Sequence, residues 1–267
     1  MGKYNSSTYR VIPFVNYIKN NITKLNIFLS LLECPGCSFK ISSLPNDEDW
    51  FCGDNEKKLK PSKNHLKGTI EYIASNPSFY NDAKNKNRKE LVSNDFATKK
   101  RKKEEAFRLL DADYNTYSPT SRKWFVFEGF TQPDLFVEGD TYILLGEGKW
   151  TENHITTATT HLNEKNGGYR NQMIRHIEGA LNYCKTNNKN KRIIAFYIVD
   201  GKCGYAQDLT RESLIEQLDR ETIGKSETLK AAIIDSFAGY TTWQQIENAF
   251  PEMERFKTKK EIDFENK

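Results

Sequence analysis

The stretch from residue 125 to residue 150 constrains the fold of this chain most strongly, because two apolar runs meet there at a short glycine-containing connection. Aromatic and β-branched residues on both sides favour strands, and such a connection between two strands predicts a β-hairpin. With the turn at residues 138–141, Asp134 lies opposite Gly146 and Glu147. The hairpin therefore brings Asp134 close to the end of its second strand.

Side chains on a strand alternate between its two faces. One face of the second strand carries Ile143, Leu145, Glu147 and Lys149, and the other carries Tyr142, Leu144 and Gly146. A carboxylate and an ammonium thus continue an apolar face. Burying such charges costs several kcal/mol, on the order of 5, unless they are paired or bind a metal. The sequence therefore predicts a compensating partner for these groups.

A divalent cation is the natural partner. Mg²⁺ prefers oxygen ligands and is usually held by one or two carboxylates, which Asp134 and Glu147 supply. The carbonyl oxygen of Gly148 is a third candidate ligand. Lys149 would lower the pKa of a bound water, orient it, or stabilise negative charge on phosphorus. In the competing interpretation, Pro133-Asp134 begins a turn and Glu147 and Lys149 form an exposed pair of little energetic value.

The residues after the hairpin predict a helix and a further strand. Residues 169–185 have apolar residues at helical spacing, and residues 191–200 contain a run of seven apolar residues typical of a buried strand. The expected order is hairpin, crossover helix and strand, with a right-handed connection.

Pro133-Asp134, twelve residues and then Glu147-Gly148-Lys149 resemble the signature of the PD-(D/E)XK nuclease superfamily, which includes many restriction endonucleases. The resemblance covers about residues 95–200. It implies that Asp134 and Glu147 bind Mg²⁺, with Mn²⁺ as a substitute, and that Lys149 assists the attacking water. It also implies a type II-like restriction endonuclease, homodimeric and part of a restriction-modification system, that cuts double-stranded DNA to leave 5′-phosphate and 3′-hydroxyl ends.

Two alternatives remain open beside this interpretation. One is a repair, recombination or phage-defence nuclease of the same fold that recognises structure rather than sequence. The other is a catalytically silent DNA-binding module that keeps the scaffold.

The resemblance extends to two weaker candidates. The segment Gln172-Met173-Ile174-Arg175 resembles a Gln-x-x-Arg element beside the active site, so Gln172 is a candidate catalytic residue and Arg175 a candidate phosphate contact. Members of the superfamily often add an acid from a preceding helix, for which Glu105 is the candidate metal ligand. A surface ion pair of Glu105 with Arg101 or Arg108 is the alternative.

Basic residues are concentrated before the hairpin. Residues 84–103 hold nine Lys or Arg against two acids, although the net charge of the chain is only +4. The densest part is expected to bind DNA phosphates and consists of Lys99, Lys100, Arg101, Lys102 and Lys103. A solvated helix face and a nuclear-import signal are the alternatives.

The five cysteines, without a secretory signal, indicate a reducing compartment. Cys34 and Cys37 resemble half of a zinc knuckle, which Cys52 and His65 would complete as a Cys₃His site. Heavy use of Asn and Lys suits a bacterial source, so the expected location is the bacterial cytoplasm. No membrane segment is expected, because the longest apolar run is far below the roughly 18 residues of a span.

We therefore expect an α/β (α+β) fold with a central mixed β-sheet flanked by helices, similar to the restriction endonuclease core. Residues 1–95 are expected to be a mostly helical region that contacts DNA or forms the zinc element, and residues 96–267 the catalytic core with C-terminal helices. Helices are predicted over residues 11–32, 66–75, 209–220 and 227–237, the last ended by Gly239. Thr242-Trp243-Gln244-Gln245 predicts a capping box that begins another helix.

Overall fold

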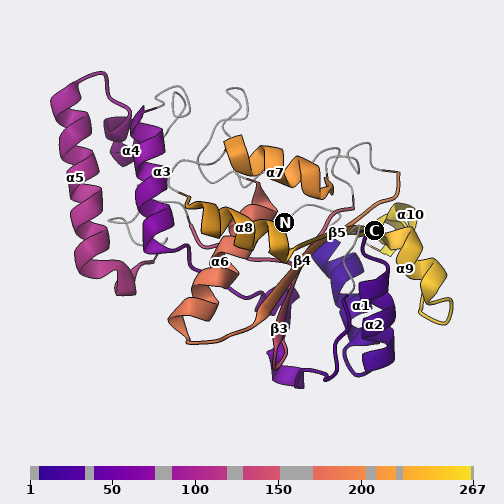
Figure 1. Cartoon of the computed structure of the whole chain (residues 1–267). Coiled ribbons are helices and arrows are strands. Elements are labelled where there is room, and N and C mark those ends of the chain that lie inside the picture. Colours follow the sequence, from indigo (N-terminus) through magenta and orange to yellow (C-terminus); the bar gives the residue numbers. More distant parts are fainter. Residues whose placement is uncertain are drawn as a thin grey trace.

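The computed structural model describes residues 6–33, 39–75, 86–118, 129–150, 171–202, 209–220 and 225–265. Its centre is a five-stranded mixed sheet with helices on both faces, an α/β fold (Figure 1). The strands follow the order of the chain: β1 (Trp50–Cys52), β2 (Leu135–Glu138), β3 (Tyr142–Gly148), β4 (Arg192–Val199) and β5 (Phe237–Thr242). Strands β1, β2 and β3 pair antiparallel, whereas β4 is parallel to both β3 and β5.

The predicted hairpin is present in the predicted register. Leu135 of β2 pairs with Gly146 of β3, and the turn is closed by a 3.0 Å hydrogen bond from the Gly139 N–H to the Tyr142 carbonyl. Asp134 directly precedes Leu135, so it lies at the end of β3 that carries Glu147. The register follows from the alternation of apolar side chains, since a slip by one residue would turn every side chain to the wrong face.

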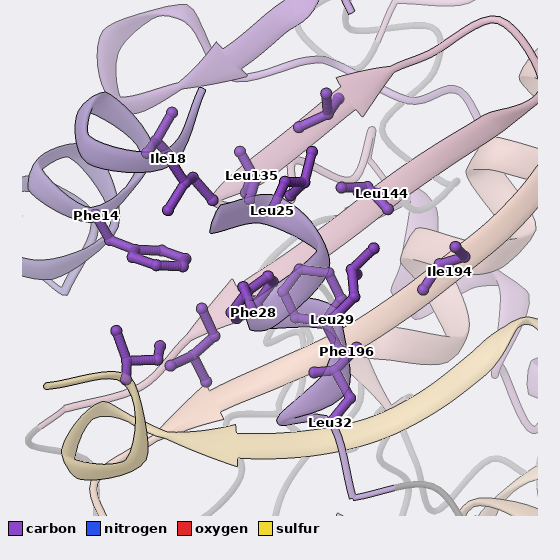
Figure 2. Close-up of a cluster of buried hydrophobic side chains, with 14 of the residues drawn as sticks. Phe14, Ile18, Leu25, Phe28, Leu29, Leu32, Leu135, Leu144, Ile194 and Phe196 are labelled. Carbon is purple, nitrogen blue, oxygen red and sulfur yellow. The ribbon is translucent and has the colours of Figure 1, made fainter. Parts of the chain in front are cut away.

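One face of the sheet is covered by α1 (Ile12–Ile18), α2 (Ile22–Ser30) and α9 (Trp243–Ala249). A π-helical segment (Ser7–Val11) runs directly into α1. Phe28 of α2 is fully buried, and its ring packs edge-on against Phe14 and against Phe196 of β4. Figure 2 shows α2 lying over the strands, with its apolar side chains turned toward Leu144 of β3 and toward β4. The expected helical stretch over residues 11–32 is thus two helices, because Asn21 caps a new one.

The opposite face is covered by α6 (Gln172–Thr186), α7 (Arg211–Arg220) and α8 (Glu227–Ser236). Helix α6 is the crossover between the parallel strands β3 and β4, which confirms the helix and strand predicted after the hairpin. Ile143 and Leu145 face this layer, whereas Tyr142 and Leu144 face the other one, as alternation requires.

A third group of helices packs on its own apolar cluster beside the sheet: α3 (Lys63–Ser75), α4 (Lys86–Leu91) and α5 (Phe96–Asp113). In Figure 1, α5 lies on the far side of α3 from the strands. The expected boundary at residue 95 does not coincide with a structural division. Strand β1 and helices α1 and α2 belong to the sheet layers, while the third helix group spans that boundary. The last described helix is α10 (Lys259–Glu265).

The expected helix over residues 227–237 is confirmed to within one residue as α8, but Gly239 does not end it. Helix α8 ends at Ser236, and the following residues form β5 beside β4. Phe237 and Ala238 are buried in the sheet, and Gly239 (φ 78°) lies within the strand rather than at a helix end. The predicted capping box of Thr242 and Gln245 does begin α9. None of the described helices has the length and apolar character needed to span a bilayer.

The aromatic contacts of Phe28 predict a large effect on stability. Phe28→Ala should lower the free energy of unfolding by about 3–5 kcal/mol, because it leaves a cavity between α2 and the sheet. Denaturant unfolding followed by circular dichroism measures the change. The control is Phe264→Ala on α10, whose side chain is 80% exposed and should shift stability by less than about 0.5 kcal/mol. Equal effects of the two substitutions would contradict this view of the core.

Candidate active site

The residues predicted around the hairpin converge at the end of β3. Asp134, just before β2, accepts a 2.9 Å hydrogen bond at Oδ2 from the Gly148 N–H of β3. Lys149 follows β3, and its own N–H donates to the Ile198 carbonyl of β4 at 2.8 Å. Backbone hydrogen bonds thus fix both the acid and the lysine relative to the sheet.

Glu147 is the centre of a buried polar network. Its Oε1 accepts from Lys149 Nζ at 2.7 Å and from Gln172 Nε2 at 2.7 Å, while Lys149 Nζ also donates to Gln172 Oε1 at 3.1 Å. Glu147 is 3% exposed and Lys149 is 6% exposed. The interpretation of an exposed pair at a strand end is therefore wrong. The structure brings Asp134, Glu147, Lys149 and Gln172 together, as the sequence predicted.

His176 completes this network and was missed as a site residue. Its Nε2 lies 3.0 Å from Glu147 Oε2, and its Nδ1 lies 2.6 Å from Thr131 Oγ1. Burial lowers the pKa of His176, an effect that the neighbouring Glu147 only partly offsets. The sequence did hold a signal, because His176 stands four residues after Gln172 and thus on the same face of α6.

A third acid, which lies outside the motif, belongs to this electrostatic environment. Glu56, in the loop after β1, accepts a 3.4 Å hydrogen bond from the Ser7 hydroxyl. Burial, together with the charge of Glu147, raises the pKa of Glu56 to about 6. No local pattern in the sequence connects Glu56 with the hairpin, so only the fold reveals it.

The pKa values of the two motif acids move in opposite directions. Burial raises the pKa of Asp134 well above its usual value, and the charges of Glu147 and Glu56 add to this effect. Burial acts in the same direction on Glu147, but Lys149 and His176 outweigh it and lower its pKa to about 2. The excess of acids therefore disfavours the ionised form of Asp134 rather than that of Glu147.

The donor set suits a hard divalent cation. Asp134 and Glu147 provide carboxylate oxygens, and Asp134 Oδ1 accepts no hydrogen bond from the described part of the chain. The raised pKa of Asp134 has the sign expected for acids that a cation would stabilise. Within the described residues, however, no three His, Cys, Asp or Glu side chains are already gathered as a metal cage. A Mg²⁺ ion would thus take further ligands from water and phosphate, as it commonly does.

Gly148 is required by close packing. A Cβ atom at this position would lie 2.7 Å from Val11 Cγ2 and 3.3 Å from the Trp243 ring, so a larger residue would force the N-terminal segment away. The Gly148 carbonyl accepts a 2.8 Å hydrogen bond from the Ser6 hydroxyl. Its predicted role as a metal ligand stays a prediction, and it would have to use the second lone pair of that oxygen.

Glu105 is not part of this site. Its carboxylate forms ion pairs with Arg101 at 2.6 Å and with Lys102 at 3.3 Å on the same helix. Helix α5 packs with α3 and α4 rather than on the sheet. The surface ion pair, the alternative interpretation of this residue, is the one that the structure supports.

The basic run on α5 is partly neutralised. Arg101 and Lys102 pair with Glu90 and Glu105, and Lys103 pairs with Glu71. Lys99 and Lys100 have no carboxylate partner in the described part of the chain, and Lys100 is exposed. The run as a DNA-binding surface stays a prediction, weakened by these ion pairs.

Arg175 is also engaged within the protein. It is 5% exposed, and its Nη2 donates a 3.3 Å hydrogen bond to the Gly129 carbonyl. This side chain is not presented for the predicted phosphate contact in this structure.

The predicted zinc site is only partly described. Cys34 and Cys37 lie outside the described residues, and Cys52 is a half-buried free thiol. His65 is buried, with Nδ1 3.3 Å from Glu178 Oε2 and Nε2 3.1 Å from Thr69 Oγ1. Both ring nitrogens are thus engaged. His65 thus links α3 to α6, and its predicted zinc ligation stays a prediction.

No model of a known protein family, no curated protein sequence and no solved structure matches this chain. The interpretation of the site therefore rests on its own geometry and chemistry.

The opposite pKa shifts of the two motif acids predict opposite effects on stability. Without divalent metal, Asp134→Asn should raise the free energy of unfolding by on the order of 1 kcal/mol at neutral pH. Asn removes the repelled charge and still accepts from the Gly148 N–H. The gain should be absent below pH 3.8, the ordinary pKa, and should grow as the pH rises through the raised folded pKa. Denaturant unfolding in EDTA across this pH range measures it.

Glu147→Gln is the matched comparison and should destabilise the protein at neutral pH by about 3 kcal/mol, because it leaves the buried Lys149 without a carboxylate. The folded pKa of Glu147, about 2, lies below the ordinary 4.5. The wild-type advantage is therefore present above pH 4.5 and declines as the pH falls toward 2. Effects of the same sign for the two substitutions would contradict the proposed distribution of charge.

Proposed function

We propose that this protein is a Mg²⁺-dependent nuclease that hydrolyses phosphodiester bonds of double-stranded DNA. The observation that carries the proposal is the convergence of Asp134, Glu147 and Lys149 at the buried end of β3, with Gln172 holding the acid and the lysine together. A buried charge cluster with an excess of acids lowers the stability of the fold, so its presence favours a role in binding or catalysis.

Each side chain has a defined task in this proposal. Asp134 and Glu147 would hold the cation, which when bound polarises a phosphate oxygen and activates water for attack. Lys149 donates hydrogen bonds to both Glu147 and Gln172. As an ammonium, it would stabilise the extra negative charge on the phosphate during attack rather than accept a proton from water. Gln172 and His176 keep Glu147 and Lys149 in position.

The arrangement of the elements also supports the PD-(D/E)XK interpretation. The antiparallel pair β2 and β3 carries the motif, α6 crosses over one face, and β4 lies parallel to β3. The superfamily resemblance implies this same order. Restriction-type sequence specificity, a homodimer and 5′-phosphate products remain proposals that follow from the resemblance, and structure-specific cleavage remains the alternative.

Cleavage of supercoiled plasmid tests the proposal. The parent with Mg²⁺ should nick or linearise the plasmid, and EDTA should abolish this activity. Asp134→Asn and Lys149→Ala should each lower the rate on the order of 10²–10³-fold, because each removes a charge placed for the transition state. Asp134→Asn is the more informative of the two variants. It should fold at least as well as the parent, so a loss of activity cannot be due to a loss of fold.

Glu105→Ala is the control, because Glu105 belongs to the separate helix group, and it should keep the parent rate. Cleavage that survives both Asp134→Asn and Lys149→Ala would place the chemistry elsewhere. A parent that binds plasmid but does not cut it with Mg²⁺ or Mn²⁺ would favour the catalytically silent DNA-binding module.

A further inference from the structure

The N-terminal segment runs along the end of β3, where the candidate active site lies. Ser6 donates to the Gly148 carbonyl, and the guanidinium of Arg10 lies 3.9 Å from the ring centre of Trp150, the residue after Lys149. Residues 6–10 therefore border the strand end that presents Glu147 and Lys149.

Arg10 lies against two aromatic rings on this border. Its guanidinium also lies 4.9 Å from the ring centre of Phe256, which packs edge-on against Trp243. Trp243 in turn donates a 2.9 Å hydrogen bond to the Lys149 carbonyl. Rings over the faces of a guanidinium leave its in-plane N–H groups for acceptors that approach from the edge.

Those in-plane donors are poorly satisfied. Arg10 is only 7% exposed, yet its Nε has no hydrogen-bond partner, and its Nη1 reaches the Tyr9 carbonyl at 3.5 Å. No carboxylate of the described residues forms an ion pair with it. Leaving a buried charged donor unsatisfied costs about 1–3 kcal/mol or more.

Other buried cations of the described chain differ from Arg10. Lys149 has Glu147 at 2.7 Å, Lys225 has Glu178 at 3.2 Å, and Arg175 has the Gly129 carbonyl. Burial lowers the pKa of Arg10 to about 10, against the raising effect of Glu247 and Asp200. The guanidinium thus remains charged at neutral pH and lacks an anionic partner within the described part of the chain.

We propose that Arg10 binds a backbone phosphate of DNA at a nucleotide flanking the scissile bond. The choice of DNA as ligand rests on the proposed function, whereas the anionic character of the ligand rests on Arg10 itself. A phosphate group presents paired oxygens that match the in-plane donors of a guanidinium edge. Thr8 is exposed and Tyr9 half-buried beside it, so this segment lies at the surface.

Binding of a fluorescently labelled duplex oligonucleotide to the full chain in EDTA tests this inference, because cleavage is then absent. Arg10→Met keeps an unbranched side chain between the rings but removes the charge. It should weaken DNA binding about tenfold and reduce the slope of log affinity against log salt by about 1. Arg10→Lys should recover part of the affinity.

The control is Lys24→Met. Lys24 of α2 also lies over an aromatic ring, 3.4 Å from the centre of Tyr17, and its substitution removes the same charge from a different ring contact. Its affinity should stay within about twofold of the parent, since one surface charge has a small effect. Thermal unfolding of both variants separates a loss of binding from a loss of fold. Weakened binding by folded Arg10→Met alone supports the proposal.

Unchanged affinity and salt slope in folded Arg10→Met would overturn the proposal and leave Arg10 as packing between two rings. Equal losses in Arg10→Met and Lys24→Met would overturn it as well, because they would reflect net charge only. If the parent binds DNA without cutting it, the nuclease function fails but the Arg10 comparison still decides this inference. A parent that does not bind DNA would refute DNA as the ligand.

Discussion

The buried contact between Glu147 and Lys149 is the interaction on which the rest of this structure depends. Two charges at 3% and 6% exposure are tolerated only if their remaining hydrogen-bonding groups are satisfied. Helix α6 supplies Gln172 and His176 from one face of the sheet, and its first turn is fixed by the Asn171 cap. From the other face, Trp243 holds the Lys149 carbonyl. The two helical layers are thus tied together at this one point of β3.

In this cluster, the acids that would serve the proposed function also lower the stability of the fold. Glu147 is well compensated, so its charge supports the fold, whereas Asp134 and Glu56 carry pKa values raised by burial and by their acidic neighbours. One ammonium cannot neutralise three acids. A protein selected only for stability would replace Asp134 by a neutral acceptor for the Gly148 N–H. The presence of a repelled carboxylate beside a buried ion pair therefore favours binding of a cation over a purely structural role.

The hairpin, the register and most of the site were predictable because their signals are local. Alternation of apolar residues fixed which face Glu147 and Lys149 take, and the turn fixed Asp134 opposite them. The failures have a different physical origin. Strand β1 has three residues, too short for a period to appear. Gly239 suits a helix end and a distorted strand equally, and only pairing with β4 decides between them. Glu56 is brought near the site by the pairing of β1 with β2, and no local sequence pattern marks it.

The surroundings of the candidate active site come from distant parts of the chain. The residues that resemble a nuclease motif lie within about residues 95–200, but the groups around them come from far outside that range: Ser6 and Arg10 precede α1, Glu56 follows β1, and Trp243 begins α9. Such contacts close long loops, so they form only when both faces of the sheet are covered. The motif therefore supplies only the two acids and the lysine. The residues that surround them and set their pKa values come from other parts of the fold. This is why the local pattern identified Asp134, Glu147 and Lys149 but missed Glu56 and Arg10.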